Sequence, residues 1–84
     1  MLCQVYRSPR RQEMYLYVAR TDGLSRVPES LLARFGEPEE VMMLALDGKR
    51  KLARADAAEV AERIRDQGYY LQMPPGSPEP QVQP

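Results

Sequence analysis

Histidine is absent from the 84 residues, and cysteine occurs once, as Cys3. The lack of histidine removes the commonest general base and the commonest metal ligand. A single cysteine can form neither an internal disulfide nor a zinc site of ordinary composition. We therefore expect no enzymatic activity, no cofactor and no metal site.

Long apolar runs are also missing, because the longest uninterrupted one covers only residues 41–46. A membrane-spanning helix needs roughly 20 apolar residues. The sequence also opens without the basic, apolar and small-residue order of a signal peptide. We therefore expect a cytoplasmic protein that makes no contact with a membrane.

Charge of one sign is not in excess, since Lys plus Arg and Asp plus Glu number 12 each. A net charge of zero removes the usual reason for nonspecific binding to nucleic acid. The length predicts one domain, and a hydrophobic content of 43% is enough for a core. Residues 75–84 are rich in proline and carry one aliphatic side chain, Val82. We predict a single domain over residues 1–74 and a disordered tail over 75–84.

The N-terminal region alternates in the way that strands do. In residues 1–7, Cys3 and Val5 share one face, which predicts a strand. Residues 13–19 alternate more clearly, with Leu16 among the apolar positions of one face and tyrosines on the other. A short polar connection between them predicts an antiparallel hairpin. Since both faces are apolar, the sheet needs cover on both sides.

Two helices are indicated by their ends. Pro28 suits the first helical position, and Gly36 is placed to end a helix over residues 28–35. Asp56, followed three residues later by a glutamate, forms a capping box that begins a second helix. Gly68 is placed to end that second helix.

The remaining segments complete the predicted sheet. Residues 41–46 are apolar without alternation, which predicts a strand covered on both faces near the middle of the sheet. Residues 69–73 predict a final strand, whereas residues 49–54 fit either a short return strand or a loop. The fold class is α/β (mixed α+β), an α/β/α sandwich around a small mixed sheet in the order strand-strand-helix-strand-helix-strand. The predicted core consists of Val5, Leu16, Val18, Leu31, Phe35, Leu44, Val60 and Ile64.

Several short motifs occur in a familiar order. They are CQVYRS at 3–8, YLYV at 15–18, LSRVPE at 24–29, LDGKRKLA at 46–53 and QGYYLQMPP at 67–75. In these motifs the sequence resembles the YcgL-domain family of small bacterial proteins. The resemblance implies an α/β/α sandwich. It implies no activity and no catalytic residues, because the family has no established biochemical function.

The sharpest charge feature is a basic turn after the third predicted strand. Its residues are Lys49, Arg50, Lys51 and Arg54, and Arg10 and Arg11 on the first hairpin are candidate neighbours. Such a turn contacts phosphates or an acidic protein surface, or it is an ordinary solvated loop. The five tyrosines offer a stacking platform for bases or pack beneath the helices. We expect packing, because a sheet covered on both faces leaves no open platform, and we expect Cys3 to be a buried small hydrophobe.

The leading functional hypothesis is a noncatalytic protein-binding or adaptor module. It rests on the lack of a nucleophile–base pair, a metal cluster and a cofactor loop in the sequence. The alternative is an RNA-associated accessory protein that uses the basic turn at 49–54. We expect the partner to be a protein, with RNA as the alternative, and the sequence leaves the oligomeric state open.

Overall fold

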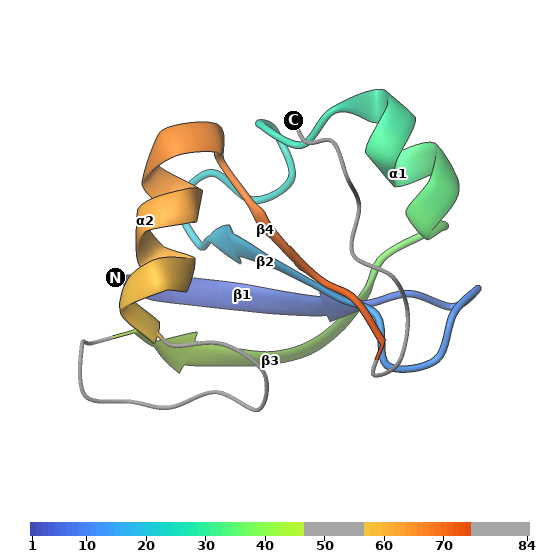
Figure 1. Ribbon diagram of the computed structural model, residues 1–84, viewed down its shortest axis with the longest axis horizontal. Coiled ribbons are helices and arrows are strands. Elements are labelled where there is room, and N and C mark those ends of the chain that lie inside the picture. Colours follow the sequence, from blue (N-terminus) through green and yellow to red (C-terminus); the bar gives the residue numbers. More distant parts are fainter. Residues whose placement is uncertain (47–56, 75–84) are drawn as a thin grey trace.

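The computed structural model describes residues 1–46 and 57–74 (Figure 1). Along the chain the elements are β1 (Leu2–Arg7), β2 (Tyr15–Ala19), α1 (Glu29–Phe35), β3 (Glu39–Ala45), α2 (Ala57–Gln67) and β4 (Tyr70–Gln72). The predicted order of strands and helices is confirmed. The basic turn at 49–54, the capping box at Asp56 and the tail at 75–84 lie outside the described residues.

The strands form one sheet in the order β3-β1-β2-β4 (Figure 1). Each neighbouring pair is antiparallel, including the predicted hairpin of β1 and β2. The sheet in the described residues is therefore antiparallel, and the prediction of a mixed sheet is wrong in this respect. The mixed α+β class is confirmed, because two helices pack on a sheet whose neighbouring strands are all antiparallel.

Each face of the sheet has its own core. On one face, α2 places Val60 and Ile64 against Cys3 and Val5 of β1. On the other face, α1 places Phe35 against apolar residues of β2. Six predicted core residues are buried, and two are partly buried. The buried ones are Val5, Leu16, Val18, Phe35, Val60 and Ile64, and the partly buried ones are Leu31 and Leu44.

Both helices end as predicted, at glycines. The N–H of Gly36, with φ of 90°, donates to the carbonyl of Leu32 at 3.0 Å, and Gly68 has φ of 97°. Pro28 is the N-cap of α1 rather than its first residue, and its carbonyl accepts hydrogen bonds from the backbone N–H groups of Leu31 and Leu32. A Cβ at Gly68 would lie 2.4 Å from the Cβ of Arg26, so glycine is also required for space. Neither described helix has the length and apolar character needed to cross a membrane.

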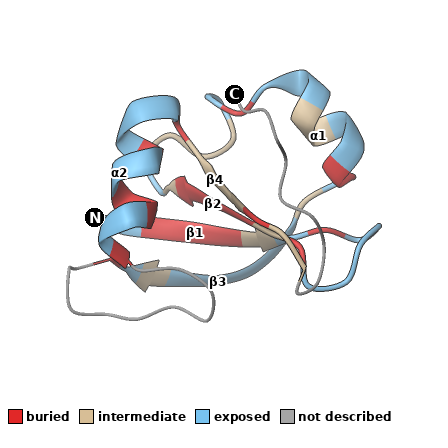
Figure 2. Ribbon diagram, viewed as in Figure 1, coloured by how far each residue is buried: buried red, intermediate tan, exposed pale blue. Residues whose placement is uncertain are grey.

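The position of β3 differs from the prediction. The expectation that residues 41–46 form a covered central strand is wrong, because β3 lies at the edge of the sheet and most of it is exposed (Figure 2). The middle of the sheet is formed by β1 and β2, which are largely buried. An apolar run indicates an extended apolar segment, but it does not specify how many strands pair with it.

Candidate functional site

The outer side of β3 is an open sheet edge. The N–H of Leu46 donates to the carbonyl of Met1 at 2.8 Å, and the Met1 amine donates to the Leu46 carbonyl at 3.2 Å. Because hydrogen-bonded and non-hydrogen-bonded pairs alternate in an antiparallel ladder, Met43 and Ala45 direct their N–H and C=O groups outward. Within residues 1–46 and 57–74, no strand pairs with that side. Such an edge is a template for another extended chain.

Apolar side chains gather along this edge. Met42 is 50% exposed on the α2 side of the sheet, opposite Val5, and Met43 is 49% exposed on the α1 side, opposite Gln4. Val41 is also exposed. Helix α2 packs against β2 and β4, and among residues 1–46 and 57–74 it has no comparable contact with β3. Exposed apolar side chains on both faces of an edge strand are typical of an interaction surface. We call Val41, Met42, Met43 and Ala45, with their outward backbone groups, the β3 edge.

A hollow of about 490 Å³ lies beside the β3 edge, on the α1 side of the sheet. Its lining comes from three places: Gln4 and Tyr6 of β1, Arg20 and Gly23 after β2, and residues 40–43 of β3. The hollow therefore joins the exposed strand to the centre of the sheet.

Gln4 is the buried polar residue of this hollow. It is 9% exposed, and its Nε2 donates to the carbonyl of Met42 at 3.0 Å. This bond lies beside an irregularity in the ladder, where the register shifts between Val5 and Tyr6. The Gln4 amide thus fixes the backbone of β3 at its bulge, which limits the regular part of the strand to residues 42–45.

Opposite charges stand at the two ends of the hollow. The backbone N–H of Arg20 donates to the carbonyl of Leu2 at 3.0 Å, and Leu2 is opposite Ala45, so Arg20 lies level with the end of β3. Its guanidinium reaches over the sheet and contacts the Met43 sulfur through Nη1. Glu40 lies opposite Tyr6, near the start of β3. The site is consequently positive at one end and negative at the other.

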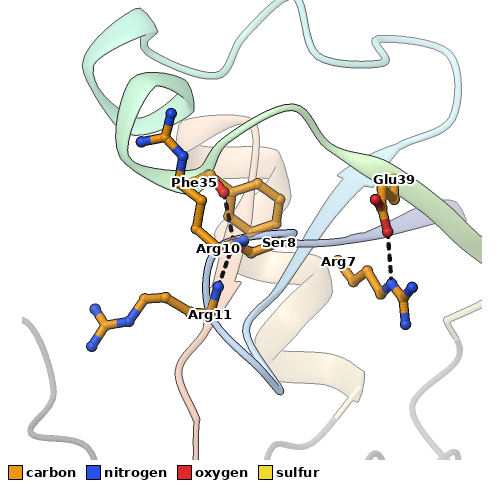
Figure 3. A network of polar contacts seen from close by, with 6 residues as sticks. All are labelled: Arg7, Ser8, Arg10, Arg11, Phe35 and Glu39. Carbon is orange, nitrogen blue, oxygen red and sulfur yellow. Dashed lines mark hydrogen bonds and ion pairs between the residues drawn. The ribbon is translucent and has the colours of Figure 1, made fainter.

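The predicted contact residues Arg10 and Arg11 belong to a turn built around Ser8 (Figure 3). The Ser8 hydroxyl donates to the carbonyl of Phe35 at 2.6 Å and accepts the backbone N–H groups of Arg10 and Arg11 at 3.0 and 3.2 Å. Nη1 of Arg10 donates to the carbonyl of Ala33 at 3.1 Å. Arg10 therefore caps the C-terminus of α1 with a positive charge, whereas the Arg11 side chain points away from the turn.

The other predicted contacts, Lys49, Arg50, Lys51 and Arg54, lie outside the described residues. The structure consequently places neither these side chains nor their relation to Arg10 and Arg11. Sequence reasoning missed the β3 edge altogether. A usable signal was the pair Glu39 and Glu40 directly before the apolar run, because charged residues are common on edge strands.

Cys3 and the five tyrosines pack in or against the two cores. Cys3 is fully buried, as predicted, and burial raises the pKa of its thiol to about 11, so the thiol is protonated near neutral pH. The Tyr17 hydroxyl donates to Oε1 of Gln72 at 3.0 Å, and its ring meets that of Tyr70 edge-on, with centroids 5.9 Å apart. Burial also raises the pKa of Tyr17. All five tyrosines lie in or against the two cores, which confirms the predicted packing.

Comparison with known proteins gives the family. The model of the YcgL domain matches residues 3–75. The chain belongs to the YcgL domain family. The resemblance seen in the sequence motifs is thereby confirmed, and the YcgL domain includes both cores, the β3 edge and the hollow.

Relatives of this YcgL domain occur in several bacteria. A Cronobacter sakazakii protein is 59% identical over 75 residues, which are 89% of this chain and 82% of that protein. A Pseudomonas aeruginosa protein is 56% identical over 78 residues, covering 93% of this chain and 80% of its own length. An Azotobacter vinelandii protein is 58% identical over 74 residues, covering 88% and 76%. Each is named a YcgL domain-containing protein, a name that states the family and no activity.

Proposed function

We propose that this chain is a noncatalytic protein-binding module that receives an extended segment of a partner protein along the β3 edge. The observation that carries the proposal is the outward backbone groups of Met43 and Ala45, flanked by exposed apolar side chains on both faces. In strand addition, main-chain hydrogen bonds supply affinity and alternate side chains supply specificity. The β3 edge offers both kinds of contact.

The state of the nucleophilic groups supports a noncatalytic role. The Cys3 thiol is buried, and burial raises its pKa to about 11, so it is not a thiolate under ordinary conditions. The Ser8 hydroxyl is engaged with the Phe35 carbonyl, and the Tyr17 hydroxyl with Gln72. These groups stabilise the fold, and their hydrogen bonds leave them poorly placed to attack a substrate.

The described residues favour a protein over RNA as the partner. Binding of single-stranded RNA on a sheet uses exposed aromatic rings, whereas the tyrosines here pack in or against the cores. Arg10 is engaged at the end of α1. The RNA alternative therefore rests on the basic turn at 49–54, outside the described residues.

One capture experiment separates these two partners. Tagged chain would be incubated with lysate of its own host cells, with and without nuclease. The wild type would be compared with Met43→Pro and with the triple variant Lys49→Glu, Arg50→Glu, Lys51→Glu. Proline at position 43 removes an outward N–H and leaves the inner ladder to β1 intact, because Met43 is a non-hydrogen-bonded position on that side.

We expect the captured proteins to survive nuclease, to be lost with Met43→Pro and to be retained by the triple variant. Met43→Lys is the second edge variant, which keeps the backbone unchanged and adds a charge that opposes strand addition. Melting curves of all variants show whether the fold is kept. Loss of capture with nuclease and with the triple variant, but with neither edge variant, would replace this proposal by the RNA alternative.

A further inference from the structure

The direction of a strand on the β3 edge follows from the rest of the sheet. The described strand pairs are all antiparallel, and antiparallel pairing is slightly more stable per residue than parallel pairing. The outward groups of Met43 and Ala45 form the start of an antiparallel ladder. An antiparallel guest enters at the Ala45 end of β3 and leaves at the Glu40 end.

The charges beside the β3 edge distinguish the two ends of such a guest. The Arg20 guanidinium lies over β3 at Met43, about one strand spacing of 4.8 Å from the path of an added strand. Glu40 belongs to β3 itself and is exposed at the opposite end of the hollow. An antiparallel guest therefore passes the positive charge beside Met43 before it reaches the negative charge of Glu40.

The middle of the edge is apolar and adaptable. Alternate guest side chains would contact Met43 beside the hollow and Met42 on the opposite face. Methionine side chains adapt to apolar groups of different shapes. The bulge near Val41 limits the regular ladder to residues 42–45, so the paired part of the guest is about four residues long.

We propose that the β3 edge selects, from a partner protein, an antiparallel strand in which an acidic residue precedes a short apolar run and a basic residue follows it. This inference rests on the proposed function and adds the order of charges that the edge recognises. A second copy of this chain is a poorer occupant. Its own β3 supplies acidic Glu39 and Glu40 before an apolar run, but the next charged residue in the sequence is another acid, Asp47, and the first base, Lys49, comes nine residues after Glu40.

The probe is a pair of synthetic peptides of identical composition, acetylated and amidated so that only the side chains carry charge. The first reads Thr-Glu-Val-Ile-Val-Lys-Thr, and the second is its reverse, Thr-Lys-Val-Ile-Val-Glu-Thr. Titration of the isotope-labelled full chain, followed by amide chemical shifts, gives both the affinity and the residues contacted. Sedimentation of the free chain over a range of concentrations measures self-association.

We expect the first peptide to bind about tenfold more tightly than the second at low salt, with shifts centred on residues 42–45. The preference should shrink as salt screens the two exposed charges. In the double variant Arg20→Glu, Glu40→Arg, the charge order of the edge is inverted and the net charge is unchanged. We expect this variant to prefer the second peptide.

Equal binding of both peptides at the β3 edge would overturn the charge order and leave the proposed function standing. An unchanged preference in the double variant would likewise overturn the roles of Arg20 and Glu40. Failure of both peptides to bind, or a β3-linked dimer that the first peptide does not dissociate, would also overturn this inference. The capture experiment with Met43→Pro then decides separately whether the edge binds another protein.

Discussion

The two edge strands of the sheet, β4 and β3, differ in length and in exposure to solvent. β4 has three residues, and its Gln72 is buried and bonded to Tyr17. Pro74 follows closely, and proline cannot extend a ladder. β3 has seven residues, and most of them are exposed (Figure 2).

This difference indicates which edge is available to a partner. Natural sheets protect their edges with short strands, cover, prolines, charges or bulges. β4 combines shortness, cover and proline, whereas β3 has a bulge and two glutamates at its start and leaves residues 42–45 open. An open apolar edge carries a risk of aggregation, and the proposed binding role would account for its presence.

The largest contrast between core and edge is expected from truncating an apolar side chain in each. Ile64→Ala should lower the free energy of unfolding by about 2–5 kcal/mol, because Ile64 is 1% exposed and the change leaves a cavity. The matched variant Met43→Ala should change it by less than about 0.5 kcal/mol, because the side chain is half exposed. Urea denaturation measures both. A large loss in Met43→Ala would mean that the β3 edge stabilises the fold.

The position of β4, the protected edge of the sheet, depends on the turn that leads from α2 into β4. Gly68→Ala should lower stability by about 1–3 kcal/mol, since φ is 97° and the new Cβ meets Arg26. Gly23→Ala is the control, because its φ of 57° is also positive but no atom lies within 4 Å of the added Cβ. Thermal melts of the two variants separate backbone strain from the steric clash. Equal losses would show that Arg26 moves aside at no cost.

The free energy of unfolding should also fall at high pH, because Cys3 lies in the centre of the sheet. The pKa of Cys3 is raised from 9.0 to about 11 in the folded state, so above pH 9 the unfolded chain loses its thiol proton first. Stability from this group is intact below pH 9 and is lost as the pH rises through 11, by about 1 kcal/mol at pH 10. Comparing urea curves of wild type and Cys3→Ala between pH 8 and 10 isolates this part from the contribution of Tyr17. If the free energies of unfolding of the two proteins fall by the same amount between pH 8 and 10, this prediction is wrong.

The smallest effect is expected at the start of β3. Arg7 Nε and Glu39 Oε1 are 2.9 Å apart, but both side chains are well exposed (Figure 3). Glu39→Gln should therefore lower stability by no more than about 0.5 kcal/mol, and 0.5 M salt should remove the difference. Thermal melts at two salt concentrations test this. A larger, salt-resistant loss would show that β3 is held to β1 by this pair rather than by its ladder.

The sequence by itself determined the local structure and the two-sided packing. Alternation placed Cys3 and Val5 on one face of β1, and Leu16 and Val18 on one face of β2, as observed. The structure adds that the two pairs belong to different cores. Gly36 and Gly68 marked the helix ends, because a positive φ favours glycine. These features depend on residues close together in the chain, which a linear pattern records directly.

Only the tertiary structure decided the order of the strands and, with it, the candidate site. The apolar run at 41–46 fits a central strand as well as an exposed edge, and its partner in β1 lies about 40 residues away. The hydrogen bond from the guanidinium of Arg10, a predicted partner contact, to the carbonyl of Ala33 at the end of α1 is likewise absent from any local pattern. The hollow between Arg20 and Glu40 arises from three separate segments. Contacts of this kind follow from the free energy of pairing and packing whole elements, which the side-chain pattern of any one segment does not contain.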